Sequence, residues 1–177
     1  MPSSTQIISL NGKSFQEICS EILKLGEQLD AVKEAKQHVD KAIARRDELD
    51  SLPKYSRKIL SLEWIDPYFS AGHWVPEQIE MAGFHSAIGK KGEISRVLTI
   101  DEIVASEPDV IAVICCGYKI EENRSFVKTL KTNSEINFLK PFASKNVYAF
   151  DSDSFFSRPT TRIIEGAEQL RDAILNK

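Results

Sequence analysis

Four aromatic rings lie close together near the middle of the chain, in the stretch from Tyr68 to Trp74. They belong to Tyr68, Phe69, His73 and Trp74, and small residues separate them. Because Pro67 has no N–H to donate to a neighbouring strand, it ends the apolar run before it, and the stretch is predicted to be a loop. Rings on a loop offer a ligand a large apolar contact area, whereas core-building rings more often lie inside regular elements.

Similar side chains occur in three further segments that follow predicted strands or precede predicted helices. Residues 92–99, 116–119 and 151–158 are expected, together with 66–74, at one edge of a sheet, where α/β proteins bind ligands. Rings with a few polar groups suit a large flat ligand that has an apolar body and polar edges. For any single ring, packing in the core is the alternative. The predicted ligand-binding residues are Trp64, Tyr68, Phe69, His73, Trp74, Arg96, Tyr118, Asp153, Phe155, Phe156 and Arg158.

Little in the sequence indicates catalysis. It contains no GxGxxG, P-loop, GxSxG or HExxH motif. Cys116 and His73 are a conceivable nucleophile and base, but no third group to orient the base is evident. Strand alternation predicts that Glu63 and Asp66 lie on opposite sides of the strand end. We therefore expect a binding protein without a covalently bound cofactor or a resident metal.

The elements that position these residues alternate between strand and helix. Short apolar runs predict strands, and apolar residues at helical spacing predict the helices between them. In chain order, the predicted elements are strand 58–64, helix 75–83, helix 99–106, strand 109–115, helix 121–131, strand 146–150 and helix 159–176. This order is typical of right-handed βαβ units. Thr99 and Glu102 predict a capping box for the helix at 99–106. The strands at 109–115 and 146–150 are predicted to be buried. The predicted fold class is α/β, with a mostly parallel sheet flanked by helices.

A different pattern precedes these units. Residues 6–10 predict a short strand, and Ser14 with Glu17 predicts a capping box for a helix that ends at Gly26. Residues 27–51 carry the longest helical pattern, which would span about 36 Å. Its apolar stripe is thin and its other faces are charged, which suits a strut that packs along one side. A plain surface helix or a coiled-coil protomer are the alternatives.

The run EWIDPYFSAGHWVPEQIEMAG, residues 63–83, resembles a segment of the helical-backbone substrate-binding proteins of ABC transporters, most closely of their cobalamin-binding branch. Segments 92–118, 146–159 and 161–170 resemble the same family in the same order. The resemblance implies three parts. Residues 1–26 would be the remnant of an N-terminal lobe, 27–52 a long backbone helix between the lobes, and 53–177 a C-terminal α/β ligand-binding lobe.

The resemblance also implies a function, namely non-covalent binding of cobalamin, another corrinoid, or a related metal chelate such as a siderophore or haem. The chain would then be the substrate-binding component of an ABC uptake system, with the ligand held between two lobes. His73 could approach the axial position of the cobalt, although helix capping or a hydrogen bond to the corrin edge are alternatives. Asp101 and Glu102 would dock on arginines of the permease. Favourable placement in the first turn of a helix is the alternative for that pair.

Composition limits the partners and the compartment. A net charge of −3 and a pI near 5.7 give no indication of a nucleic-acid partner. Cys19, Cys115 and Cys116 lack metal-ligand spacing and predict reduced, buried thiols of a cytosolic chain. Neither a signal peptide nor a transmembrane segment is recognisable. The family, in contrast, is periplasmic or extracytoplasmic.

A fragment, or a truncated or split relative, would explain both the absent signal and the absent lobe. A complete chain would be cytoplasmic. A separate N-terminal lobe or a homodimer could supply the other half of the ligand contacts. Two alternatives therefore remain beside the transport function: a one-lobe interaction or structural protein inside the cell, and a small enzyme that uses Cys116 and His73.

Overall fold

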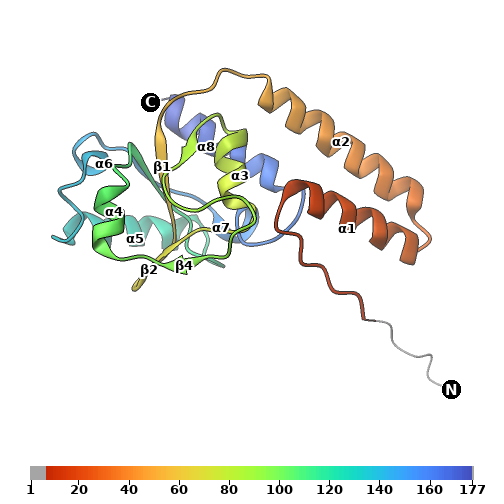
Figure 1. Cartoon of the computed structure of the whole chain (residues 1–177), viewed down its shortest axis with the longest axis horizontal. Coiled ribbons are helices and arrows are strands. Elements are labelled where there is room, and N and C mark those ends of the chain that lie inside the picture. The colour runs from red at the N-terminus through yellow and green to blue at the C-terminus, as the bar shows by residue number, and fades with distance from the viewer. Residues whose placement is uncertain (1–6, 177) are drawn as a thin grey trace.

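The computed structural model of the protein describes residues 7–176, which form one sheet with helices on both faces (Figure 1). In this range the sheet has six strands in the order β4-β2-β1-β5-β6, and β3 also pairs with β1. The strands are β1 (Lys58–Ile65), β2 (Tyr68–Ser70), β3 (His85–Ser86), β4 (Arg96–Val97), β5 (Val110–Val113) and β6 (Val147–Ala149). The pairs β1–β3, β1–β5 and β5–β6 are parallel, whereas β2 is antiparallel to β1 and to β4. The predicted α/β fold with a mostly parallel sheet is confirmed.

The helices cover this sheet and extend beyond it on one side (Figure 1). They are α1 (Phe15–Gln28), α2 (Val32–Asp50), α3 (Val75–Met81), α4 (Ile100–Ala105), α5 (Ile120–Thr132), α6 (Lys140–Ala143), α7 (Ser152–Phe155) and α8 (Ile163–Leu175). None of the helices in the described part of the chain is both long and apolar enough to cross a bilayer.

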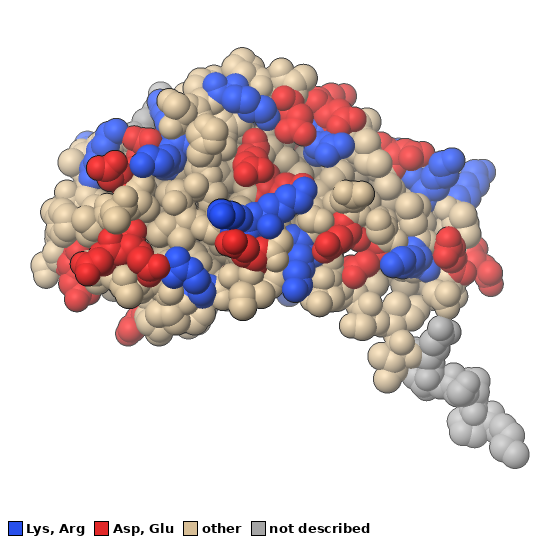
Figure 2. All heavy atoms as spheres, in the orientation of Figure 1, with Lys and Arg blue, Asp and Glu red and all other residues tan. Residues whose placement is uncertain are grey.

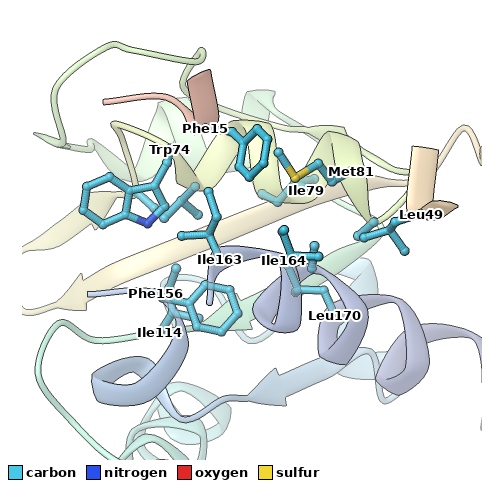
Figure 3. Close-up of a cluster of buried hydrophobic side chains, with 14 of the residues drawn as sticks. Phe15, Leu49, Trp74, Ile79, Met81, Ile114, Phe156, Ile163, Ile164 and Leu170 are labelled. Carbon is cyan, nitrogen blue, oxygen red and sulfur yellow. The ribbon is translucent and has the colours of Figure 1, made fainter. Parts of the chain in front are cut away.

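The central strand β1 separates two clusters of buried side chains, because successive residues of a strand point to opposite faces. Ile59 belongs to the cluster that packs against α3 and α8, and Figure 3 shows Ile79 and Ile163 in this cluster. Leu60 belongs to the other cluster, together with Ile103 of α4 and residues of α5. Both faces of the sheet are therefore filled.

The N-terminal helices form a hairpin instead of the predicted short helix followed by a strut of about 24 residues. Helix α1 continues through Gly26, and the left-handed backbone of Asp30 lies in the turn before α2. Gly26 serves a close approach of the two helices, since a Cβ there would overlap the Cβ of Ala35. The apolar stripe predicted for residues 27–51 includes Leu29 and Val32. This part of the prediction is wrong, because both side chains are exposed.

Helix α2 has 19 residues and lies against α8 along part of its length. Arg45 of α2 forms ion pairs with Glu165 and Glu168 of α8, and His38 is hydrogen-bonded to Thr161. These exposed pairs each contribute little stability, about 0–1 kcal/mol. Together they fix the side of α2 that faces the sheet domain.

The segment before α1 contains no strand in its described part, Ile7–Leu10, and Gln6 lies outside the described residues. The predicted N-cap is correct, because the Ser14 hydroxyl accepts a hydrogen bond from the N–H of Glu17 at 3.3 Å. The second hydrogen bond of the predicted capping box, from the N–H of Ser14 to the Glu17 carboxylate, is not formed. The Glu17 carboxylate instead accepts from the N–H of Lys13 at 2.7 Å.

Three further predictions can be compared with the structure. The capping box of Thr99 and Glu102 at the start of α4 is confirmed in both directions. Strand β6 is half-buried rather than fully buried, because it is the last strand of the sheet. The predicted loop 151–158 contains the short helix α7, and the final helix begins at Ile163 instead of Pro159.

Charges of both signs are interspersed on the face of the molecule drawn in Figure 2. Lysines and arginines there neighbour aspartates and glutamates over the sheet domain and over the helical hairpin. A mixed surface of this kind gives no basic stripe on that face for a polyanion to follow.

Candidate ligand-binding site

The predicted ring-bearing loop begins as a strand of a hairpin. The Asp66–Pro67 peptide, which is cis, lies in the turn between β1 and β2. Tyr68 and Phe69 lie in β2, paired with β1, and not in a loop. Pro67 thus reverses the chain instead of ending the sheet, because a turn needs no N–H from this position. The consequence is an antiparallel ribbon that extends the sheet beside the end of β1.

A β-bulge in β1 sets the direction of the side chains at this end. Leu62 pairs with Ser70, but the next pair is Trp64 with Phe69, so that two residues of β1 oppose one step of β2. A bulge of this kind turns two consecutive side chains toward the same side. Glu63 and Trp64 accordingly line the same cavity. Without the bulge, Trp64 would lie on the same face as Leu62.

Cross-strand pairing then aligns three apolar side chains in one row. Trp64 pairs with Phe69, and Phe69 pairs with Val97 of β4. Residues directly opposite each other in antiparallel strands project to the same face. The exposed fraction is 37% for Trp64 and 51% for Val97, and Phe69 is half-buried. The row is therefore an apolar surface that the helices leave uncovered.

An open cavity of about 360 Å³ lies at this row. Its lining residues, which together are called the rim cavity here, are Glu63, Trp64, Pro67, Phe69, Ser95 and Cys116. They come from the end of β1, the hairpin turn, β2, the segment before β4 and the segment after β5. Ser95 Oγ donates a hydrogen bond to Glu63 Oε2, and the N–H of Cys116 donates to the carbonyl oxygen of Glu63 at 3.1 Å.

Aromatic packing supports the indole of Trp64 from the side of α5. The ring centroids of Trp64 and Tyr118 are 5.6 Å apart, and Tyr118 meets Phe126 of α5 edge-on at 5.1 Å. Trp64 Nε1 donates to the carbonyl oxygen of Asp66 at 2.9 Å. Such ring pairs and the hydrogen bond restrict the orientation of the indole.

Buried polar groups connect the cavity to the loop after β6. Asn123 accepts from the N–H of Cys115 at 3.0 Å and donates to the carbonyl oxygen of Phe150 at 2.9 Å. The hydroxyl of Ser157 accepts from the N–H of Gly117 at 2.9 Å. The ends of β5 and β6 are thus held together, as the prediction of a common edge requires.

The sequence matches no known family model, and no curated protein is found as a relative. Solved structures do resemble it. One is an ABC transporter substrate-binding protein from Listeria monocytogenes EGD-e, with a TM-score of 0.85, 19% identity, and coverage of 96% of this chain and 68% of that one. The chain has a periplasmic-binding-protein-like fold.

Two further solved structures of this fold are a haem complex and a protein named for vitamin B12. The haem complex of IsdE from S. aureus has a TM-score of 0.81 and 18% identity, with coverage of 97% of this chain and 69% of the other. The periplasmic vitamin B12 binding protein BtuF of Vibrio cholerae has a TM-score of 0.70 and 16% identity, with coverage of 97% and 65%. The chain thus spans between 65% and 69% of the length of these three proteins.

Within this periplasmic-binding-protein-like fold, three of the predicted ligand-binding residues are core residues. Trp74 is 9% exposed and packs among Phe15, Ile79 and neighbouring apolar side chains, as Figure 3 shows. Phe156 is buried in the same cluster, and Tyr68 is buried in the other one. The assignment of Trp74 and Phe156 to a ligand surface is corrected, because side chains that fill a closed interior cannot meet a ligand without opening it. Tyr68 lines a separate cavity of about 500 Å³ together with Leu98 and Asn133, and not the rim cavity.

Burial also explains the state of the Tyr68 hydroxyl. It accepts a hydrogen bond from Asn133 Nδ2 at 2.7 Å, and desolvation raises the pKa of the phenol. Tyr68 therefore remains a neutral hydrogen-bonding group of the interior.

Three charged residues that were predicted to bind ligand form ion pairs instead, namely Arg96, Arg158 and Asp153. Arg96 NH1 lies 2.8 Å from Glu102 Oε1, and Arg158 NH2 lies 2.9 Å from Asp153 Oδ1. Hydrogen bonds, first from the N–H of Thr99 and then from Arg96, lower the pKa of the Glu102 carboxyl. These charges are available to a ligand only if their present partners are exchanged.

His73 and Phe155 lie away from the lining of the rim cavity. His73 has a left-handed backbone, with its N–H donating to Glu93 at 2.6 Å and its carbonyl accepting from Gly92 at 2.8 Å. The ring of Phe155 is half-buried and has the guanidinium of Arg162 4.7 Å above it. Of the predicted set, the structure thus brings Trp64 and Phe69 into the cavity and Tyr118 beside it.

Sequence reasoning missed Pro67 and Ser95 as lining residues, although both lie in segments that it assigned to the ligand edge. Glu63 and Cys116 were considered only for catalysis. The thiol of Cys116 is exposed, whereas burial raises the pKa of the Cys115 thiol to about 12. Among the residues that the structure describes, no cluster of three or more His, Cys, Asp or Glu side chains could hold a metal ion.

Proposed function

We propose that this chain is a ligand-binding component of an ABC uptake system and that its ligand lies against the rim cavity. The observation that carries the proposal is the uncovered row of Trp64, Phe69 and Val97 at the carboxyl end of β1. In open α/β sheets ligands bind outside this end of the strands. A flat macrocycle fits a row of rings, because stacking removes a large apolar area from water.

The proposed ligand is cobalamin or another corrinoid, with haem or a siderophore chelate as the alternatives. The similar structures include one named for vitamin B12 and one that holds haem. A cavity of about 360 Å³ is too small to enclose such a molecule and suits one face or one edge of it. His73 is not a lining residue, so we expect contacts to the macrocycle and its edge rather than a histidine–cobalt bond.

A second lobe would supply the other face of the ligand site. Ile7 is 89% exposed, and Ile8 and Leu10 of the same extended segment are also exposed, as are Leu29 and Val32 of the helical hairpin. Exposed apolar side chains favour association. We propose that a separate lobe or a second copy of the chain covers them, and that affinity for the ligand is low without it.

The proposed contact with a permease is Asp101. It is exposed in the first turn of α4, whereas the neighbouring Glu102 is occupied by the capping box and by Arg96. A free carboxylate on the surface suits an arginine of a partner. In this function the chain would act outside the cytoplasm, and catalysis has no part in it.

Titration with dicyanocobinamide, haem and ferrichrome tests the proposal, with the absorption bands of each chelate as the signal. We expect saturable binding of one of them in the micromolar range or weaker. Replacement of Trp64 by Ala should weaken this binding about tenfold or more, since a central aromatic contact is worth about 1.4 kcal/mol or more.

Phe138→Ala is the matched control, because Phe138 is an exposed ring at a different surface, with an exposed fraction of 63%. This variant should bind like the unmodified chain. Binding that Trp64→Ala leaves unchanged would place the ligand elsewhere. The second candidate function is that of a one-lobe interaction protein, and the exposed Leu29 and Val32 favour it. The absence of ligand binding, together with a stable dimer through residues 29–50, would support this second candidate.

A further inference from the structure

A second cavity, of about 500 Å³, lies at the same hairpin turn as the rim cavity, and Pro67 lines both. It is called the hairpin cavity here, and it lies between the β1–β2 hairpin, the start of α4 and the end of α5. A cavity of this size accommodates a small molecule. The proposed uptake function makes no use of it. The lining residues that define its chemistry are Ile65, Asp66, Pro67, Tyr68, Ile100 and Glu135.

A buried hydroxyl with an unused proton belongs to this cavity. Tyr68 is 7% exposed, and its hydroxyl oxygen accepts a hydrogen bond from Asn133 Nδ2 at 2.7 Å. The amide of Asn133 is fixed in this orientation, because its Oδ1 accepts from the N–H of Glu135 at 2.9 Å. Among the described residues, the phenolic proton itself has no acceptor. A buried donor without an acceptor is costly, which favours a ligand group that accepts from it.

Two carboxylates give the hairpin cavity negative charge. Asp66 and Glu135 are exposed and both line it. Neither forms an ion pair with a lysine or arginine in the described part of the chain. Desolvation is the largest cause that raises the pKa of Tyr68, but both carboxylates raise it as well, so both act on the position of the hydroxyl. A positive group beside this hydroxyl is therefore attracted to both.

Positively charged side chains do not offset these carboxylates inside the cavity. No lysine or arginine of residues 7–176 is among the lining residues. Arg96, before α4, is paired with Glu102, and Arg124 of α5 is paired with Glu121. Lys131 of α5 is exposed and does not line the cavity. The charge of the cavity therefore favours a cation over an anion.

Apolar side chains form the remaining part of the lining. Ile65 and Ile100 are half-buried, and Pro67 is exposed in the turn. Leu98 and Leu130, which also line the cavity, are buried in the core cluster that packs against α4 and α5. An apolar group placed against these side chains is removed from water. The cavity thus offers apolar contact, negative charge and one unused donor.

We propose that the hairpin cavity binds a small organic cation, namely an amphipathic amine that carries a hydroxyl group next to its ammonium group. The ammonium group lies beside Asp66 and Glu135, where its hydrogen bonds are charge-assisted. The hydroxyl group of the ligand accepts the proton of Tyr68, and the apolar body lies against Ile65 and Ile100. This site is separate from the rim cavity and does not depend on the proposed uptake function.

Calorimetric titration of the full chain with three probes of similar size tests the proposal. 2-Amino-1-phenylethanol has all three groups, 1-phenyl-1,2-ethanediol has a hydroxyl in place of the ammonium, and 2-phenylethylamine lacks the hydroxyl. We expect saturable binding of the amino alcohol with one ligand per chain. It should bind at least about tenfold more tightly than the diol. It should also bind at least about threefold more tightly than 2-phenylethylamine, which leaves the phenolic proton unused.

Variants assign these preferences to the residues. The double variant Asp66→Asn, Glu135→Gln should reduce the preference for the amino alcohol over the diol to about threefold or less, because it removes both charges. Tyr68→Phe should keep that preference and abolish the preference over 2-phenylethylamine. Glu34→Gln with Asp40→Asn, which removes two exposed carboxylates from α2, is the matched control and should change neither. If Tyr68→Phe does not fold, the two amines compared on the unmodified chain still test the hydroxyl contact.

Three results would overturn the proposal. Equal binding of the amino alcohol and the diol would show that the cavity does not select a cation. A preference that the double variant leaves unchanged would show that Asp66 and Glu135 do not hold the ammonium group. Absence of binding at millimolar concentrations of all three probes would show that the cavity is not a site for this class of ligand. The chelate titrations decide the uptake function separately, whichever result is found.

Discussion

Trp64 and Phe69 are cross-strand partners at the end of the β1–β2 hairpin, and a bulge at Glu63 brings both to the rim cavity. The second tryptophan of the chain, Trp74, is only ten residues away and is buried against α8 and Phe15. The two indoles thus differ in role although both belong to one continuous motif. This difference leads to the first of five predictions.

Replacing each tryptophan by alanine should separate binding from stability. Trp74→Ala should lower the free energy of unfolding by about 3–5 kcal/mol, because it leaves a large cavity in the core. Trp64→Ala should lower it by about 1 kcal/mol, since the indole is 37% exposed and loses mainly its contact with Tyr118. Urea unfolding followed by circular dichroism measures both values. Similar losses for the two variants would contradict the assignment of Trp64 to the site.

Glu77 should hold the helical hairpin and the segment before β4 to the sheet domain. Its carboxylate is 11% exposed, accepts from the N–H of Phe15 at 2.7 Å and is paired with Lys91. Glu77→Ala should cost about 2–3 kcal/mol, because the buried N–H loses its acceptor. Hydrogen exchange in residues 90–95 should become faster. Glu80→Ala, an exposed neighbour on the same helix, is the control and should alter neither quantity.

Asn123 should position the edge of the sheet from inside. It is fully buried and connects the N–H of Cys115 to the carbonyl oxygen of Phe150. Asn123→Ala leaves both groups without partners and should cost about 2–4 kcal/mol in unfolding free energy. Binding of the corrin should also weaken at temperatures where the variant remains folded. The exposed Asn137 offers the control, Asn137→Ala, with an expected change within about 0.5 kcal/mol.

Cys116 should be the reactive thiol among the three cysteines of the chain. It is exposed, whereas Cys19 and Cys115 are buried and burial raises the pKa of both thiols, for Cys115 to about 12. Iodoacetamide at about pH 8 should modify one thiol per chain, as counted by mass spectrometry. Bound dicyanocobinamide should slow this reaction because Cys116 lines the rim cavity. Modification of Cys116→Ser without denaturant would show that a buried thiol is accessible.

Asp109 should make the stability depend on pH. The hydrogen bond from Lys140 Nζ, and then that from the N–H of Lys58, lower the pKa of its carboxyl below the ordinary 3.8, against the effect of burial. A lowered folded-state pKa means that this stabilisation is present above pH 3.8 and is lost as the pH falls through the lower folded value. The difference in unfolding free energy between the unmodified chain and Asp109→Asn should therefore shrink below about pH 4.

The exposed Asp40 on α2 supplies the control for the pH dependence. Asp40→Asn replaces an exposed carboxylate on the surface, and at pH 7 it should change the free energy of unfolding by no more than about 0.5 kcal/mol. If the difference for Asp109→Asn grew toward acid, the assigned direction of the pKa change would be wrong.

Local signals in the sequence determined most of the elements. The β-branched run at 110–113 became the buried strand β5, and the Thr99–Glu102 pair capped α4 as predicted, since both depend on neighbours within a few residues. Gly26 shows where this reasoning fails. Its role is the approach of α1 to α2, and no local pattern distinguishes that from a helix end.

The sheet edge at which the candidate site lies was predictable from the sequence, but the residues that line the site were not. Chain order alone brings residues after β1, β5 and β6 to one end of a parallel sheet. Which rings face outward there depends on one extra residue in β1, because a shift of one residue exchanges the two faces of a strand. Only the tertiary structure decided that Trp64 and Phe69 line the rim cavity, while Trp74 and Phe156 fill the interior.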